Sequence, residues 1–280
     1  MARQRLLGEA ARARLLGLPA HEREVLRHAT LGPEDLALIA QRRGQPNQLG
    51  FALILVCLRY LARVLEANEV PPPALLAHLA QQLDVDAGAF AIYARRDQTR
   101  RTHLAELTRR LGLLAFDRAA FHAMVDWALP IVPSVRSPEA MATLLVEELR
   151  HRHILLPSIA VLELIVRTAQ RRAEAAVQRA LTEGLSGRTL AALELLVQAG
   201  PETVPSRLAW LRTASRSPAA RNLLGLIERL DFVRSLGVSR TLQGAIPQVA
   251  FQRLVGEAMP MTAQHLAEAT TSRRLALLSQ

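Results

Sequence analysis

Repeated helix-start signals are the feature of this sequence that most restricts its fold. In "LGPEDLALIAQRR", Pro33 takes a first-turn position, two acidic residues follow it, and arginines close the segment. Proline fits the first turn of a helix, and acidic residues there and basic residues at the end complement the helix dipole. "RSPEAMATLLVEELR" repeats the pattern with Ser137 as the cap and Pro138 next, and "RSPAARNLLGLIERL" repeats it with Ser217 and Pro218. Each segment therefore predicts a helix.

The composition supports the same fold class. Leucine, alanine and arginine dominate, whereas aromatic residues make up 4% of the chain. These are good helix formers, and the residues that favour strands are sparse. "PSIAVLELIVRTAQRRAEAAVQRAL" predicts one long helix from about Ser158 to Leu181, and no alternating strand pattern exceeds a few residues. We expect an all-α protein of two or more small helical domains.

Proline-rich stretches mark the expected domain boundaries. "LPIVPSVRSP", from Leu129 to Pro138, holds three prolines, which interrupt a helix and stiffen a connection. The predicted domains are therefore residues 1–132 and 137–280, with a weaker sub-boundary at Ala199 to Ser206, "AGPETVPS". No repeat of fixed period indicates a solenoid.

The charge is strongly one-sided. All 35 basic residues are arginine, the formal net charge is +10, and the calculated pI is about 11.3. Coding bias in a GC-rich genome is the explanation of the absence of lysine that requires no function. The physical consequence holds either way, because the planar guanidinium grips phosphate with two hydrogen bonds. Nucleic acid is the first partner expected, and an anionic membrane surface the second.

Several classes of protein are not expected. Cys57 is the only cysteine, so the chain has no disulfide framework and no thiolate zinc site. The longest apolar block, Phe51 to Leu58, is far shorter than the ~20 residues of a membrane-spanning helix. The N-terminal stretch lacks the apolar core of a signal peptide. We therefore expect a cytoplasmic protein.

Catalytic motifs are also absent from the sequence. It contains no GxxxxGK[ST] phosphate loop, no GxSxG elbow and no HExxH zinc motif. His151 and His153 alternate along a helix and so do not share a face, which favours a solvated basic end. Asp84 and Asp86 fall where a turn is expected. We expect no catalytic residue, metal ligand, cofactor or small-molecule substrate in this chain.

Arginines gather in three places. The first holds Arg42 and Arg43, with Arg59 and Arg63 beyond the apolar block. The second, "YARRDQTRRTHLAELTRR", has six arginines, with only two acidic residues as internal partners, which favours a polyanionic partner. The third, "ELRHRHILLP", has Arg150 and Arg152. A solvated helix surface is the alternative interpretation of each cluster.

Two structural expectations concern these clusters. A turn from Gly44 to Gly50 is expected to precede a buried helix that starts at Phe51 and continues through Val64 and Leu65. "PPALLAHLAQQLDVDAGAFAIYARR" is compatible with a helix-turn-helix unit, whose second helix would lead into the arginines. Other two-helix hairpins look similar, and Asp84 stands where such a turn usually has glycine.

The order of three blocks resembles a known family. "RRGQPNQLGFAL…LRYL", "YARRDQTRRTHLAEL" and "RHRHILLP" are similar in order and spacing to the N-terminal region of the replicative transposases of class II transposons, the Tn-three family. Further segments, including "SRLAWLR" and "IERL", extend the resemblance over most of the chain. Gln48, Pro46 and Thr102 stand where the family usually has other residues.

The resemblance implies helical DNA-binding domains that recognise the terminal inverted repeats of a transposon. It also implies that strand cleavage belongs to an RNase-H-like DDE domain with magnesium, which these 280 residues do not match. The partner would then be double-stranded DNA in the bacterial cytoplasm, at the nucleoid. The residues expected to contact it are Arg42, Arg43, Asn47, Arg59, Arg95, Arg96, Arg100, Arg101, His103, Arg150 and Arg152.

Two alternatives remain open at the level of sequence. The chain could be a helical assembly module that forms a homodimer, since its Ala/Leu-rich helices have broad apolar faces. It could equally be a truncated, inactive transposase remnant.

Overall fold

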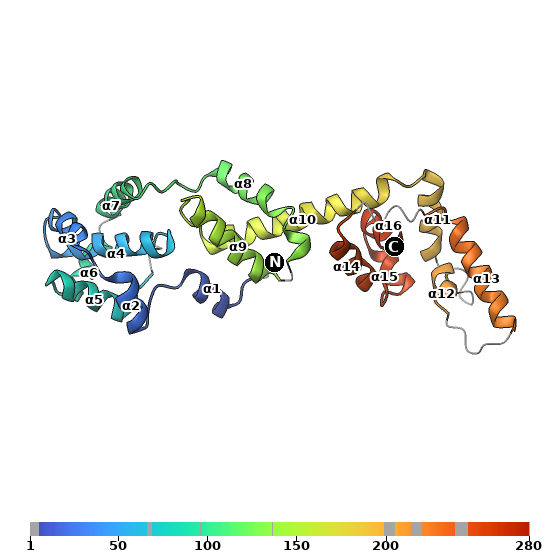
Figure 1. Cartoon of the computed structure of the whole chain (residues 1–280), viewed down its shortest axis with the longest axis horizontal. Helices are drawn as coiled ribbons and strands as arrows, with labels where there is room; N and C mark the ends of the chain where they lie inside the picture. The colour runs from blue at the N-terminus through green and yellow to red at the C-terminus, as the bar shows by residue number, and fades with distance from the viewer. Residues whose placement is uncertain are drawn as a thin grey trace. The chain divides into compact units, whose positions relative to one another are not determined.

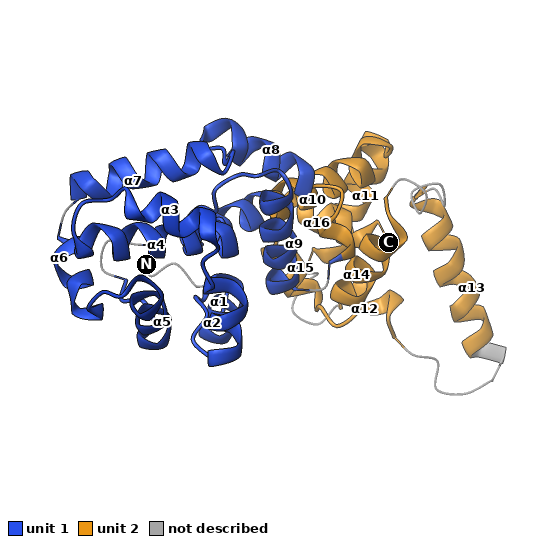
Figure 2. Ribbon diagram, turned by 60° about the vertical axis from the view of Figure 1, so that its left-hand side comes forward, with its two compact units in different colours: residues 1–128, 135–168 blue, residues 129–134, 169–280 orange. Residues whose placement is uncertain are grey.

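The computed structural model describes residues 6–65, 69–95, 97–135, 137–198, 205–213, 220–238 and 246–279. The described chain is helical, apart from a single parallel bridge between Leu114 and Ile154, so the all-α prediction is confirmed (Figure 1). The chain divides into two compact units. Unit 1 comprises residues 1–128 and 135–168, and unit 2 comprises residues 129–134 and 169–280 (Figure 2).

Within its described residues, unit 1 contains nine α-helices, a short 3₁₀ helix and the first part of a tenth α-helix. They are α1 (Glu9–Leu16), α2 (Glu22–Ala29), α3 (Pro33–Ala40), α4 (Gln45–Leu61), α5 (Pro73–Leu83), η1 (Ala87–Ala89), α6 (Phe90–Ala94), α7 (Asp97–Arg110), α8 (Arg118–Ala128), α9 (Pro138–His151) and α10 (Ile159–Glu183).

Unit 2 contains the rest of α10 and several shorter elements. They are η2 (Val132–Ser134), α11 (Gly187–Val197), α12 (Arg207–Leu211), α13 (Ala220–Ser235), α14 (Gln248–Ala258), α15 (Ala263–Glu268) and α16 (Thr271–Leu278).

The helix starts expected from the sequence lie where the caps indicated. α3 begins at Pro33, and α9 begins at Pro138 behind Ser137, whose hydroxyl accepts a 3.2 Å hydrogen bond from the amide of Ala140. That bond satisfies one of the free amides of the first turn. The predicted start at Ser217 and Pro218 lies outside the described residues.

The central helix of unit 1 differs from its expected bounds. α4 begins at Gln45, directly after Gly44, so the expected turn up to Gly50 is wrong. Gly44 has φ +83, a conformation that glycine adopts without strain, and Pro46 then fits the first helical turn. α4 ends at Leu61, and the left-handed Ala62 stops it before Val64 and Leu65.

The prediction that this helix is buried is confirmed. Every residue from Leu49 to Leu58 is buried, and most of them form one hydrophobic core of unit 1 together with side chains of α2, α3, α5, α6 and α7.

α10 runs from Ile159 to Glu183, close to the expected bounds, and contributes residues to both units. The two units divide between Thr168 and Ala169, inside this helix, and residues 129–134 of the proline-rich stretch are assigned to unit 2. Domains at 1–132 and 137–280 stay a prediction, as does the sub-boundary, most of which lies outside the described residues.

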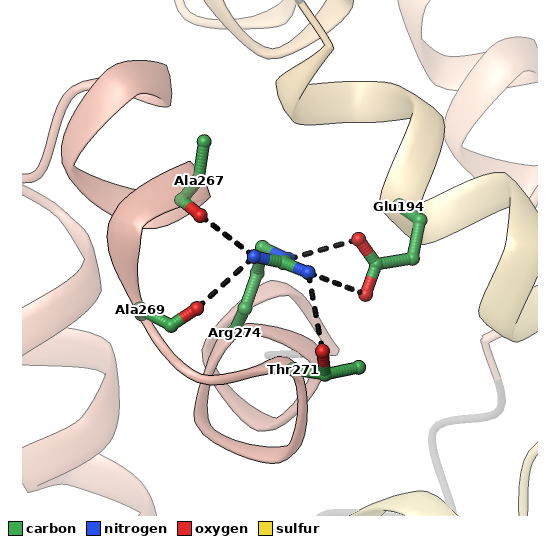
Figure 3. Close-up of polar contacts among 5 residues, drawn as sticks. All are labelled: Glu194, Ala267, Ala269, Thr271 and Arg274. Atoms are coloured by element: carbon green, nitrogen blue, oxygen red, sulfur yellow. Dashed lines mark hydrogen bonds and ion pairs between the residues drawn. The ribbon is translucent and has the colours of Figure 1, made fainter.

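In unit 2, one arginine joins three helices (Figure 3). Nε and Nη2 of Arg274 on α16 donate to both carboxylate oxygens of Glu194 on α11, at 2.9 and 3.1 Å. Its Nη1 donates to the carbonyls of Ala267 and Ala269 at the end of α15, at 2.8 and 3.0 Å. Arg274 is therefore a structural tie, because its donors are used within the unit.

Candidate nucleic-acid interface

The predicted helix-turn-helix segment is built differently from the expectation. α5 ends at Leu83, and the capping residue Asp84 has φ 52 and ψ 50, in the left-handed region that glycine usually occupies at a helix end. The predicted second helix is divided into η1, the five-residue α6 and α7, with a break at Arg95. A single second helix leading into the arginines is therefore not formed.

The arginine-rich segment folds as a helix of its own, α7. Asp97 begins it, with a negative charge at the positive end of the helix dipole, and Arg109 and Arg110 end it. Arg95 caps α6 and so precedes α7, and Arg96 lies outside the described residues.

The inner side of α7 is tied to the rest of unit 1. Leu107 is fully buried, and His103 is buried with its Nδ1 2.9 Å from the hydroxyl of Tyr93 on α6. Burial is the main cause that lowers the pKa of His103 and raises that of Tyr93, so both groups are held neutral. His103 is a core residue, and its position argues against a direct contact with DNA.

Arg42 is a second tie to the inner side of α7. Its Nη1 donates to Oε2 of Glu106 at 2.8 Å, and its guanidinium lies over the ring of Phe51, 4.7 Å from the centroid. Only 17% of the Arg42 side chain is exposed. The guanidinium of Arg42 is thus engaged by a carboxylate and an aromatic ring of its own unit, and few of its N–H donors are available to a phosphate.

The outer side of α7 carries a polar face that makes few contacts. Residues three and four apart share a side of a helix, and five exposed residues with that spacing form what we call the outer stripe: Gln98, Arg101, Thr102, Ala105 and Arg109. Neither Arg101 nor Arg109 has an ion pair or hydrogen bond through its side chain to another described residue. The outer stripe is therefore a basic surface open to a partner.

Three other predicted contacts lie in internal pairs. Arg59 donates through both terminal nitrogens to Asp35, at 2.6 Å each, and this bond is the main cause that lowers the pKa of that aspartate. Arg150 donates to the carbonyl of Leu61 at 3.3 Å, and Arg152 pairs with Glu148 at 2.6 Å. Each of these arginines has a structural contact.

The remaining predicted residues differ in exposure. Arg43 and Arg95 are exposed, whereas Asn47 lies in the first turn of α4 and donates to the carbonyl of Arg43 at 2.9 Å. Arg100 is one-fifth exposed, with Asp97 4.0 Å away. The predicted residues thus divide into structural ties and an exposed subset.

The sequence reasoning missed Arg109. It stands eight residues after Arg101, and two helical steps of four place both on one side of α7. That spacing was visible once the helix was known to continue unbroken to Arg110.

Among the described residues, no group of three His, Cys, Asp or Glu side chains could hold a metal ion. Within the same ranges, no helix is long and apolar enough to cross a membrane.

The fold and the site thus define an all-α protein in which one helix exposes arginines to solvent. Residues 6–169 match a family model described as a domain of unknown function, DUF4158. The match covers more than half of the chain, so the chain belongs to the DUF4158 family.

The chain is also similar to known transposases. It is 34% identical over 99% of its length to the transposase for transposon Tn3926 of Escherichia coli, and 32% identical over 99% to that for Tn21 of the same species. It is 32% identical over 100% of its length to the transposase for Tn501 of Pseudomonas aeruginosa. The chain spans 28% of the length of each of these relatives. The predicted resemblance to these transposases is confirmed.

Proposed function

We propose that this chain is a DNA-binding module of a transposase, which recognises the terminal inverted repeats of a transposon through the outer stripe of α7. The observation that carries the proposal is the exposure of Arg101 and Arg109 on one side of α7, without side-chain partners among the described residues. The relatives, each a transposase for a named transposon, supply the biological setting.

The spacing of the two arginines fits a DNA groove. Eight residues at 1.5 Å per residue separate Arg101 and Arg109 by about 12 Å along the helix. The major groove of B-DNA is also about 12 Å wide. A helix that crosses the groove thus places one guanidinium near the phosphates of each strand, and such contacts set affinity and register.

The same stripe offers groups for reading bases. Gln98, Thr102 and Ala105 lie beside the arginines, and all three are exposed. A glutamine amide can pair with adenine through two hydrogen bonds, a threonine hydroxyl can donate or accept, and a small apolar side chain can contact the methyl group of thymine. We assign sequence preference to these residues and electrostatic affinity to Arg101 and Arg109.

Fluorescence anisotropy across a salt series tests the proposal. The chain is titrated onto a labelled duplex carrying a transposon terminal repeat, and onto a scrambled duplex of equal composition. Each neutralised phosphate contributes about 0.9 to the slope of log K against log salt, so replacing both arginines by alanine should lower the slope by about 1.8.

The matched control is the double variant Arg23→Ala with Arg27→Ala, which removes two exposed arginines of α2. It should leave the slope nearly unchanged. Equal slopes for the two double variants, or no preference of the wild-type chain for the repeat, would contradict the proposal and favour an assembly module or an inactive remnant.

In the full-length transposase, cleavage and magnesium binding would belong to segments outside the aligned region. We propose no catalytic, cofactor or small-molecule site for this chain, and we place it in the bacterial cytoplasm, bound to the nucleoid.

One observation favours assembly as a second function. α13 exposes Leu223, Leu226, Leu230 and Val233, each between 45 and 60% accessible, on one side of the helix. Their spacing of three, four and three residues reads the same in both directions, so an antiparallel copy of α13 presents a matching stripe. We propose that a second copy of the chain packs there.

Light scattering after size exclusion, with and without DNA, tests this second function. A dimer that Leu226→Glu with Leu230→Glu converts to a monomer supports it. A wild-type monomer at all concentrations contradicts it.

A further inference from the structure

Two polar links, one buried and one partly buried, connect the inner side of α7 to other helices. His103 shares a 2.9 Å hydrogen bond with Tyr93, and Glu106 accepts a 2.8 Å hydrogen bond from Arg42. The two helix residues are three apart and so lie on one side, with Leu107 beside them. Neither link uses a residue of the outer stripe.

Aromatic packing joins the two links into one cluster. The ring of Phe51 meets His103 edge-on at 5.0 Å between centroids and lies under the guanidinium of Arg42. The rings of Tyr93 and His103 stack at 5.6 Å with an angle of 16°. We call Arg42, Phe51, Tyr93, His103 and Glu106 the polar latch.

The approach of Tyr93 depends on the absence of a side chain on α4. A Cβ added to Gly50 would lie 2.1 Å from the Tyr93 ring, so only glycine leaves room for it. The tyrosine therefore packs directly on the α4 backbone, where its hydroxyl reaches His103.

The apolar contacts of α7 restrain rotation of the helix about its own axis only weakly. Its sequence, "DQTRRTHLAELTRR", has Leu104 and Leu107 as its only large apolar residues, and Leu104 is half-buried. Hydrophobic contacts are not directional, whereas a hydrogen bond weakens when its angle changes. The polar latch therefore supplies the directional restraint on the helix.

We propose that the polar latch sets the rotation of α7 about its axis and so keeps Arg101 and Arg109 facing outward together. Its members are positioning residues for DNA binding and do not contact DNA. This inference rests on the proposed function for its biological meaning. The rotation of α7 can be measured without DNA.

The first test therefore measures the exposure of two positions on α7, with one cysteine introduced at a time. Ala105 lies on the exposed outer stripe, whereas the hydroxyl of Thr108 is buried. The native Cys57 is 1% exposed, and burial raises its pKa to about 12, so it stays silent toward a thiol reagent at neutral pH. Ala105→Cys and Thr108→Cys are compared in the otherwise unchanged chain and in the latch variant Tyr93→Phe with Glu106→Gln.

With an intact latch, the thiol at position 105 should react many times faster than the thiol at position 108. In the latch variant, the ratio should fall toward one as α7 turns. A ratio unchanged in a folded latch variant overturns the inference. If the double variant does not fold by circular dichroism, Tyr93→Phe alone, which keeps the ring, is measured in the same way with the same two outcomes.

The second test measures how the polar latch affects DNA binding. In the latch variant, the salt slope should fall as it does for Arg101→Ala with Arg109→Ala, and combining the two sets should give no further loss. Additive losses overturn the inference. If the wild-type chain shows no salt-dependent duplex binding, the proposed function fails while the thiol ratio still decides the latch.

Discussion

The inner side of α7 presents a histidine and a glutamate that form hydrogen bonds to other helices. The outer stripe presents arginines whose side chains form no ion pair or hydrogen bond with another described residue. His103 and Glu106 have partners at 2.9 and 2.8 Å, while Arg101 and Arg109 point to solvent. The same helix therefore combines a fixed side and an open side, and only the open side is available for a polyanion.

The comparison also separates arginines that look alike in the sequence. Arg42 and Arg59 face carboxylates of other helices, and both become structural ties. Density of arginine in a segment does not decide the role. The presence of a carboxylate within reach in the fold does, because a guanidinium already paired with a carboxylate would have to break that ion pair to bind DNA.

The largest loss of stability is expected from a substitution that disrupts the packing behind the inner side of α7. Gly50→Ala forces a Cβ to 2.1 Å from the Tyr93 ring, so α4 and α6 must separate. Overpacking of this kind costs about 3 kcal/mol in the free energy of unfolding. Urea denaturation followed by circular dichroism measures it. Gly256→Ala in α14, where nothing lies within 4 Å, is the control and should stabilise slightly, because alanine favours helix. Equal stabilities would refute the close contact.

A smaller loss is expected from Glu106→Gln. The change leaves Arg42 largely buried without its charged partner, although the one-third exposure of Glu106 moderates the effect. We expect a loss of about 1–2 kcal/mol. Denaturation of Glu106→Gln, Arg42→Met and the double variant gives the coupling. If the losses in the free energy of unfolding of the two single variants add up to that of the double variant, the ion pair contributes no stability.

Lower pH should weaken the inner side further. Burial and the charge of Arg42 lower the pKa of His103 below its ordinary value of 6.5, although Glu106 opposes them. The unfolded chain then takes up a proton where the folded chain does not. The stability contributed by neutral His103 is therefore complete above about pH 6.5 and is lost as pH falls below it. Chemical denaturation at pH 7.5 and 5.5 measures this, and His103→Gln should show a smaller difference between the two. An identical pH dependence in the variant would contradict the assignment.

The smallest effect on stability should come from the outer stripe. Arg101→Ala with Arg109→Ala removes no described contact, so the free energy of unfolding should change by less than about 0.5 kcal/mol. Thermal unfolding in parallel with the DNA titration checks that binding and folding separate on this side. A large loss of stability would show that the stripe is structural.

Local features of the fold were predictable from sequence, and contacts between distant segments were not. Ser137 and Pro138 predict the start of α9, because a helix cap acts within one turn of the chain. The start of α4 was missed because the role of Gly44 depends on its positive φ. Arg42 was expected to contact DNA, since Glu106 stands 64 residues away and no local signal joins them. The family resemblance pointed to whole segments and did not separate their inner residues from their outer ones.

The continuity of α10 bears on how the chain can be divided for study. Leu162 and Ile165 are buried in unit 1, whereas Val177 and Leu181 belong to the core of unit 2. A fragment ending at Thr168 keeps only the first turns of α10, fewer than the roughly 12–15 residues at which an isolated helix becomes marginally stable. Fragments that overlap across the whole of α10 would give each unit its complete helix.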